Sequence, residues 1–264
     1  MTRLPHLPII VDYSDGAWTV ETQNRMVSAL AYPDRVCAIV FRGREEGLKK
    51  LLNAMNRPFP ALESLELDFR DNQGQDPLPP VSPGLNYPPP SLRNNPLPLR
   101  RLIYTGRADP LLFQILSHTK SLVKLTMCVD RIVFSPQRSA LLAHLQDMPL
   151  LRHVEVELWL PPLSSSSLQV PDGVRRHAVL LSKLTSLRII GHCIPVDPLI
   201  PELSTPFLQE FHFYVSLHHK SPTFHIPHLS EFIRGTGIVF CAAQVKFLQE
   251  GHHHFLADTS TFYY

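Results

Sequence analysis

Residues 59–67 read Phe-Pro-Ala-Leu-Glu-Ser-Leu-Glu-Leu, and they contain a pattern that recurs along the chain. The pattern is an apolar residue, two variable residues, an apolar residue, one variable residue and a third apolar residue. Its copies begin at positions 36, 62, 99, 122, 151, 184, 208 and 242, at intervals of 23 to 37 residues. The last two apolar positions alternate with polar ones, which is typical of a strand with one buried face.

Helix-like segments separate these strands. Residues 45–56 place leucines at helical spacing, and both Asp109-Pro110 and Ser135-Pro136 are typical helix starts. A further helix is expected over 225–234, with Gly235 as its stop. A strand, a loop and a helix in each repeat predict an α/β fold, an irregular leucine-rich-repeat-like solenoid with a parallel sheet on one face and helices on the other. A doubly wound sheet is the alternative, although no Gly-rich turn follows any strand.

We expect a single domain over residues 1–248 and a C-terminal tail over 249–264. Two segments fall outside the repeat. Residues 71–98 form a Pro-rich inserted loop, and residues 161–175 form a Ser/Pro loop that includes four consecutive serines. Both are expected to be irregular connections between repeats.

The charge balance narrows the classes of partner. The 264 residues include 25 Lys and Arg and 23 Asp and Glu, which give a net charge of +2. A nucleic-acid binder or an anionic-membrane binder would show a basic excess. The four cysteines form no Cys-x-x-Cys pair, and residues 1–12 make a poor signal peptide. We therefore expect an intracellular protein, cytoplasmic or nuclear, that binds neither nucleic acid nor membrane.

Candidate chemistry is sparse in the sequence, and we expect no catalytic, cofactor or metal site. The histidine runs 218–219 and 252–254 lack fixed Cys or Asp partners, and Pro227 separates His225 from His228. Glu155 and Glu157 share one strand face and are the best candidates for acid–base work, yet an exposed sheet face carries such pairs too. The sequence lacks Gly-x-Ser-x-Gly, the phosphate-loop motif and His-Glu-x-x-His.

The sheet face that points away from the core is the better candidate. Over its whole length the outward positions carry five acidic residues and five basic residues, including Arg42 and Lys246 from the outer copies. A mixed face with Tyr, His and Arg suits a specific protein partner better than a polyanion. The residues expected to bind a protein are Glu66, Asp68, Arg101, Lys124, His153, Glu155, Glu157, Arg188, Glu210, His212 and Tyr214.

A family resemblance rests on the order of several blocks. They are residues 7–13 (Leu-Pro-Ile-Ile-Val-Asp-Tyr), a short helix near 25–30, residues 34–36, 59–67, 99–102, 148–154 and 184–187. This order resembles the leucine-rich-repeat-like C-terminal regions of F-box domain-containing proteins of basidiomycete fungi, over roughly residues 5–248. The F-box itself is not seen, and the asparagine ladder of regular leucine-rich repeats is absent.

The resemblance implies a substrate receptor of a ubiquitin ligase, in which the F-box binds the ligase adaptor and the repeats bind a target. For this chain we expect a non-catalytic protein-interaction module that binds its partner through the sheet face. A contact with a cullin–RING ligase adaptor is expected only if an F-box lies upstream. The alternatives are an α/β enzyme with a carboxylate site near Glu155 and Glu157, and a non-functional truncated remnant.

Overall fold

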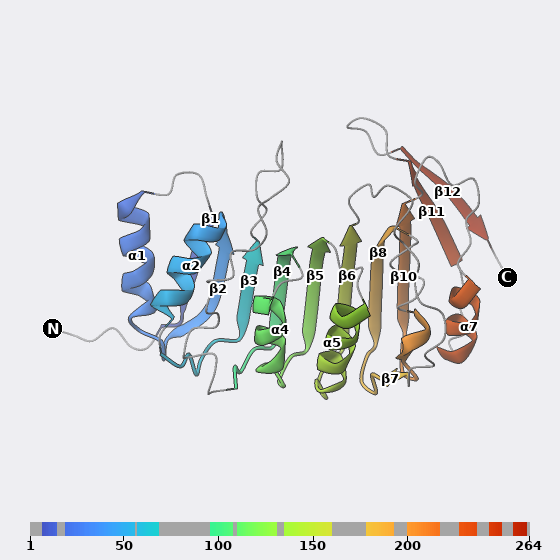
Figure 1. The fold of residues 1–264 in the computed structure, drawn as a ribbon, viewed down its shortest axis with the longest axis horizontal. Helices are drawn as coiled ribbons and strands as arrows, with labels where there is room; N and C mark the ends of the chain where they lie inside the picture. The colour runs from blue at the N-terminus through green and yellow to red at the C-terminus, as the bar shows by residue number, and fades with distance from the viewer. Residues whose placement is uncertain are drawn as a thin grey trace. The chain divides into compact units, whose positions relative to one another are not determined.

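The fold is described from a computed structural model of the chain (Figure 1). The residues fall into two compact units, Met1–Leu125 and Thr126–Tyr264. The described residues are 7–14, 19–55, 57–68, 96–107, 110–130, 135–159, 178–192, 200–216, 227–236, 243–249 and 256–262. In this part of the chain, no helix is both long and apolar enough to cross a membrane.

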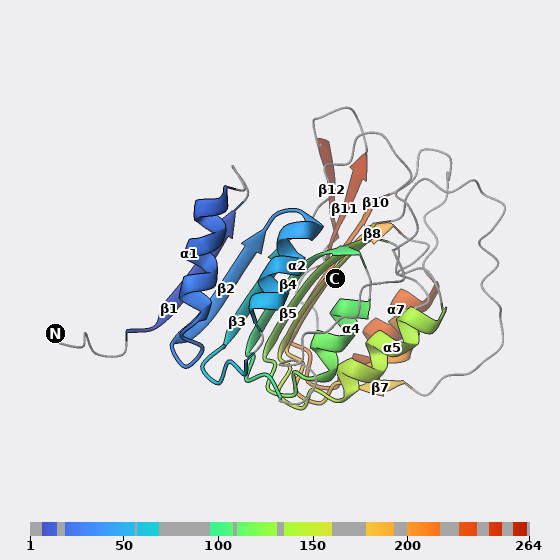
Figure 2. The same cartoon turned by 60° about the vertical axis from the view of Figure 1, so that its left-hand side comes forward.

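The first unit alternates strands and helices. Its elements are β1 (Ile9–Ser14), α1 (Val20–Leu30), β2 (Val36–Arg42), α2 (Glu45–Ala54), β3 (Ser64–Asp68), β4 (Arg101–Arg107), α4 (Pro110–Ser117) and the first two residues of β5 (Lys124–Asp130). Strands β1, β2, β3 and β4 pair side by side in chain order, and every pair is parallel. The three helices lie on the same side of these strands in both views (Figures 1 and 2).

The second unit continues the alternation from Thr126 onward. Its elements are the rest of β5, α5 (Ser135–Gln146), β6 (His153–Trp159), β7 (Val179–Leu180), β8 (Ser186–His192), the 3-10 helix η1 (Ile200–Glu202), β9 (Leu203–Ser204), β10 (Glu210–Ser216), α7 (Pro227–Thr236), β11 (Ala243–Gln249) and β12 (Leu256–Phe262). Strands β6, β8, β10 and β11 pair in parallel, and β12 is antiparallel to β11. The short strands β7 and β9 form a separate parallel pair. The prediction of an α/β fold with a parallel sheet is confirmed.

Each of the eight predicted copies contains a strand. The copies on β2, β3 and β4 pair at equivalent positions, as do the copies on β6, β8 and β10. Leu65 of β3 lies opposite Leu102 of β4, and Leu187 of β8 lies opposite Phe211 of β10. The last copy departs from this register, because Phe247 of β11 pairs with Val215 rather than with Phe213. Only residues Val215 and Ser216 of β10 are paired with β11 in the described part of the chain.

The apolar positions of the copies form the core. In the copies that begin at 62, 99, 122, 151 and 184, all three apolar side chains are buried. Full burial of a leucine side chain contributes about 1.5–3 kcal/mol, so these positions dominate the stability of each strand. In the copy at 208 Leu208 is buried, while Phe211 and Phe213 are half-buried and Phe211 packs on Phe232 of α7 with ring centroids 5.2 Å apart.

A repeated backbone arrangement accompanies the first leucine of a copy. In four copies its N–H donates to the carbonyl three residues earlier at 3.2 Å; the leucines are Leu62, Leu151, Leu184 and Leu208. The carbonyl after that leucine then accepts hydrogen bonds from two successive N–H groups of the next copy. For example, the Glu63 carbonyl binds the N–H groups of Arg100 (2.8 Å) and Arg101 (3.0 Å). The Arg100, Arg152 and Thr185 carbonyls do the same, so this arrangement satisfies the backbone where β4, β5, β8 and β10 begin.

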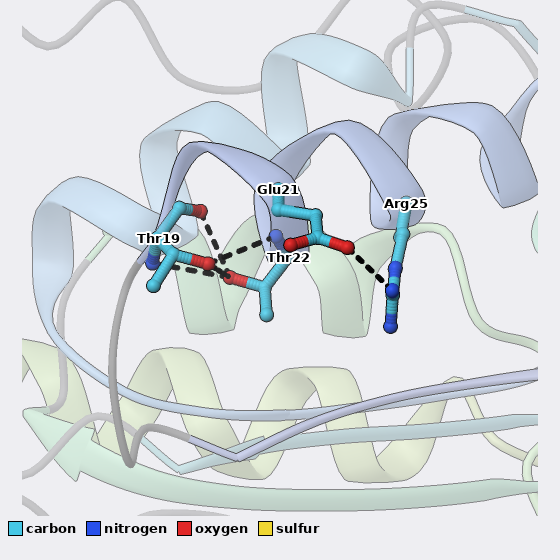
Figure 3. Close-up of polar contacts among 4 residues, drawn as sticks. All are labelled: Thr19, Glu21, Thr22 and Arg25. Atoms are coloured by element: carbon cyan, nitrogen blue, oxygen red, sulfur yellow. Dashed lines mark hydrogen bonds and ion pairs between the residues drawn. The ribbon is translucent and has the colours of Figure 1, made fainter.

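Helix α1 begins earlier than the expected short helix near residues 25–30. The Thr19 hydroxyl accepts from the N–H of Thr22 at 3.2 Å, and the Thr22 hydroxyl accepts from the N–H of Thr19 at 3.2 Å (Figure 3). This reciprocal capping box satisfies two backbone donors at the helix start. One turn further on, Arg25 forms an ion pair with Glu21 on the exposed side of the helix.

Three expectations about local structure need correction or comment. Gly235 does not stop the last helix, because α7 continues through Thr236. Thr105, which the alternation of residues 101–107 places on the outward side of β4, is buried at 8% exposure. The expected tail contains β12, whose seven residues pair with β11.

The expected loop at 161–175 lies outside the described residues, as does the loop at 71–98 except for residues 96–98. The single domain over 1–248 stays a prediction.

Candidate protein-binding face

The residues predicted to bind a protein lie between the buried positions of the strands. In the second unit, seven of these residues on β6, β8 and β10, together with the neighbouring outward residues Ser186 and Ile190, form a surface of nine residues that we call the unit 2 outer face. Its members are His153, Glu155, Glu157, Ser186, Arg188, Ile190, Glu210, His212 and Tyr214, all exposed or half-buried. They alternate with core residues such as Val154 and Leu187, and therefore point away from the helices.

The parallel register arranges these nine residues in three rows across the three strands. The middle row contains Glu155, Arg188 and His212, which lie directly opposite one another. The row before it contains His153, Ser186 and Glu210, and the row after it contains Glu157, Ile190 and Tyr214. Arg188 therefore occupies the centre of the unit 2 outer face.

The Arg188 guanidinium is held from two sides. Its Nη1 lies 3.2 Å from Oε1 of Glu155, and its Cζ lies 5.2 Å from the centroid of the Tyr214 ring. The Tyr214 ring also stacks on His212, with centroids 6.3 Å apart and an interplanar angle of 2°. The Arg188 side chain is nevertheless 45% exposed. A half-exposed arginine fixed by an ion pair and an aromatic ring is suited to anchor a partner protein.

The first unit carries its own outward residues, and an ion pair between two of them joins β2 and β3. Arg42 donates to Oε1 of Glu66 through Nε at 2.9 Å and through Nη2 at 2.7 Å. The hydrogen bond and charge of Glu66 raise the pKa of Arg42, and Asp12 and Asp68 add to this effect. Asp68 is half-buried, whereas Arg101 and Lys124 are exposed on β4 and β5.

The other candidate residues from the sequence are its histidines and the pair Glu155 and Glu157. The histidine runs 218–219 and 252–254 and His225 lie outside the described residues. His228 lies on α7, where its Nδ1 is 3.8 Å from Glu231. In the described ranges no group of three or more His, Cys, Asp or Glu side chains could hold a metal ion. Glu155 and Glu157 share the outer face as expected, and Glu155 is the partner of Arg188.

Two outward residues of β1 were missed by the sequence reasoning. Ile10 is 67% exposed, and Asp12 is exposed two residues further along the same strand. The signal that could have found them is the alternation of residues 9–13, in which Val11 and Tyr13 are the buried members.

Lys246, which the sequence predicted as an outward residue of the sheet, lies on β11. Its side chain is outside the described part of the chain.

No family model, no curated protein and no solved structure matches the chain.

Proposed function

We propose that the chain is a non-catalytic protein-interaction module, and that its copies form an irregular leucine-rich-repeat-like solenoid. Two regularities support the solenoid. The copies on β2, β3 and β4, and those on β6, β8 and β10, pair at equivalent positions. In four copies the carbonyl after the first leucine accepts two successive N–H groups of the next copy. Such a repeat buries its apolar face against its neighbours and leaves a row of side chains on every strand for binding.

The observation that carries the binding role is the position of Arg188. It lies at the centre of nine outward residues, is fixed by Glu155 and Tyr214, and keeps nearly half of its side chain exposed. Arginine and tyrosine are the residue types that contribute most at protein interfaces when they are central and rigid. By the resemblance to fungal F-box proteins, the partner is the target of a ubiquitin-ligase receptor of which this chain is the substrate-binding part.

The test is affinity capture of the tagged chain from its native cells, followed by mass spectrometry. The double substitution Glu155→Lys with Glu157→Lys reverses charge on the outer face, and Glu231→Lys is the control on α7, where the side chain is 74% exposed. We expect the double variant to lose a protein that the wild type and the control both retain. Equal capture by all three chains would contradict the proposal.

The same experiment tests the ligase role separately. Recovery of a cullin and its adaptor together with the face-dependent partner would support a substrate receptor. Recovery of that partner without ligase components would leave an interaction module and remove the ligase role.

A further inference from the structure

Strand β1 is the terminal strand of the first unit's parallel sheet and has an open edge. It pairs with β2 on one side, and no described strand pairs with its other side. The Ile9 N–H donates at 2.7 Å to the carbonyl of Arg35, the residue just before β2. Since successive residues of a strand direct their N–H and C=O groups to opposite sides, those of Ile10 and Asp12 point to the open edge. This edge can therefore form backbone hydrogen bonds with a further strand.

The alternation along β1 is regular. The register with β2 skips one residue, Cys37, after the first residue of β1, so the extra residue belongs to β2. Along β1 itself, Ile10 and Asp12 are exposed, while Val11 and Tyr13 are buried. Strand β1 thus keeps the two-residue period that pairing with another strand requires.

Exposed apolar side chains accompany the open edge. In the described part of the first unit, four large apolar side chains are exposed, and all four lie on β1, on α1 or next to them. They are Leu7 (63%), Ile10 (67%), Val27 (44%) and Tyr32 (56%). An open strand edge with apolar side chains beside it is a site where another strand adds.

We infer that β1 pairs with β1 of a second copy of the chain, in an antiparallel arrangement centred on Ile10. Two identical edges related by a two-fold axis perpendicular to the sheet run antiparallel. At the centre, Ile10 exchanges backbone hydrogen bonds with Ile10 of the second copy, and the two exposed side chains meet. On the other face of the sheet, Ile9 lies opposite Val11 of the second copy. The Asp12 N–H donates to the Pro8 carbonyl, which needs no donor from proline.

The charge of Asp12 selects this register among those that the edge allows. A pairing centred on Asp12 would place two carboxylates directly opposite each other, which is destabilising. A pairing centred on Val11 would set the exposed Ile10 side chain against the Asp12 carboxylate instead of an apolar side chain. In the Ile10 register, Asp12 lies opposite Pro8, and the two Asp12 residues are about 14 Å apart along the strands. A second copy therefore matches both the apolar and the charged positions of this edge.

The first test is the mass of the full chain in solution, measured by light scattering after size-exclusion chromatography. We expect the wild type at about 50 µM to have twice the mass of its 30.0 kDa chain. Ile10→Lys places two like charges at the centre of the pairing, and should raise the dissociation constant of the dimer at least about tenfold. Leu150→Lys is the control and should leave the dimer unchanged, because it makes the same kind of change at a side chain 42% exposed in the second unit.

The second test reads the register by disulfide crosslinking under mild oxidation. Opposite residues in a hydrogen-bonded antiparallel pair have Cα atoms about 5.5 Å apart, which is within the range of a disulfide. Ile10→Cys should therefore link two copies covalently. Asp12→Cys should give less than about a tenth of that yield, since these residues are about 14 Å apart. The wild type, with its native cysteines, gives the background yield.

A monomeric wild type at that concentration would overturn the inference, and so would a dimer that Ile10→Lys leaves intact. Equal crosslinking at positions 10 and 12 would contradict the pairing centred on Ile10. The inference uses residues of the first unit alone and goes beyond the proposed function. The capture experiment with the unit 2 outer face tests that function separately, whichever result the dimer gives.

Discussion

Glu155 and Arg188 lie directly opposite each other on the parallel strands β6 and β8, and their side chains form an ion pair of 3.2 Å. Both side chains reach solvent, at 30% and 45% exposure respectively. Exposed ion pairs contribute little to stability because water and salt screen them. We therefore expect Glu155→Gln to change the free energy of unfolding by less than about 1 kcal/mol in a denaturant titration. A loss above about 2 kcal/mol would show that the pair supports the fold, contrary to a binding role.

Gly191 is expected to be intolerant of a side chain. It adopts φ of 154°, and a Cβ atom built there would lie 2.3 Å from the backbone oxygen of Leu158 on β6. Because the obstacle is backbone, it cannot move aside without disturbing the strand pairing. Gly191→Ala should lower the free energy of unfolding by more than about 2 kcal/mol, measured by urea denaturation. A variant as stable as the wild type would contradict the register that pairs β6 with β8.

Gly235 provides the matched control for that substitution. It lies in the last turn of α7, and a Cβ atom there would meet nothing within 4 Å. Alanine costs less conformational entropy than glycine in a helix, so Gly235→Ala should raise the free energy of unfolding by about 0.5 kcal/mol. Destabilisation by Gly235→Ala would mean that α7 ends before this residue, as the sequence pattern alone predicts.

The capping box of α1 gives a fourth prediction. Thr19→Ala removes the hydroxyl that accepts from the Thr22 N–H, and should cost about 1 kcal/mol of stability in thermal or denaturant unfolding. Thr19→Ser keeps the hydroxyl and should stay within a few tenths of a kcal/mol of the wild type. Equal losses in the two variants would assign the effect to packing of the threonine methyl group instead.

His144 on α5 makes stability depend on pH. Partial burial lowers the pKa of its imidazole below the ordinary value of 6.5, against the smaller opposing effect of Asp147. The unfolded chain therefore takes up a proton at a higher pH than the folded chain does. The neutral imidazole therefore contributes its full stabilisation above about pH 6.5. This stabilisation is lost as the pH falls through the folded-state pKa, and a further fall in pH changes it no more.

The check is the difference between the wild type and His144→Gln in the free energy of unfolding, followed between about pH 7 and pH 5. The glutamine variant should lose less stability than the wild type over this range, because it has no imidazole to protonate. An identical slope for both chains would mean that His144 has the same pKa in the folded and unfolded states.

The strands of the core were predictable because their apolar residues repeat. The spacing of Leu62, Leu65 and Leu67 fixes both the start of β3 and its buried face, and the same spacing located seven further strands. Strand β12 was missed because it joins the sheet through antiparallel backbone pairing and carries no copy of the pattern. Helix α1 was shortened in the prediction because its capping box uses Thr22 where glutamate or glutamine is usual.

The candidate face was predictable in its members but not in its arrangement. Alternation along each strand indicates which residues point outward, whereas only the register between strands brings Glu155 opposite Arg188 and places Tyr214 beside it. Alternation does not tell how far neighbours cover an outward residue, so the burial of Thr105 could not be predicted from it. The two-residue shift of β11 against β10 is likewise set by strand pairing, which the pattern of one strand does not encode.

The most direct test of the central claim is site-specific photocrosslinking in native cells. A photoreactive amino acid replaces His212, which is exposed on the unit 2 outer face, or Glu231, which is exposed on α7. The account predicts a crosslinked adduct with one recurring protein from position 212 and none with that protein from position 231. Adducts with that protein from both positions alike, or from position 231 alone, would contradict binding through the sheet face.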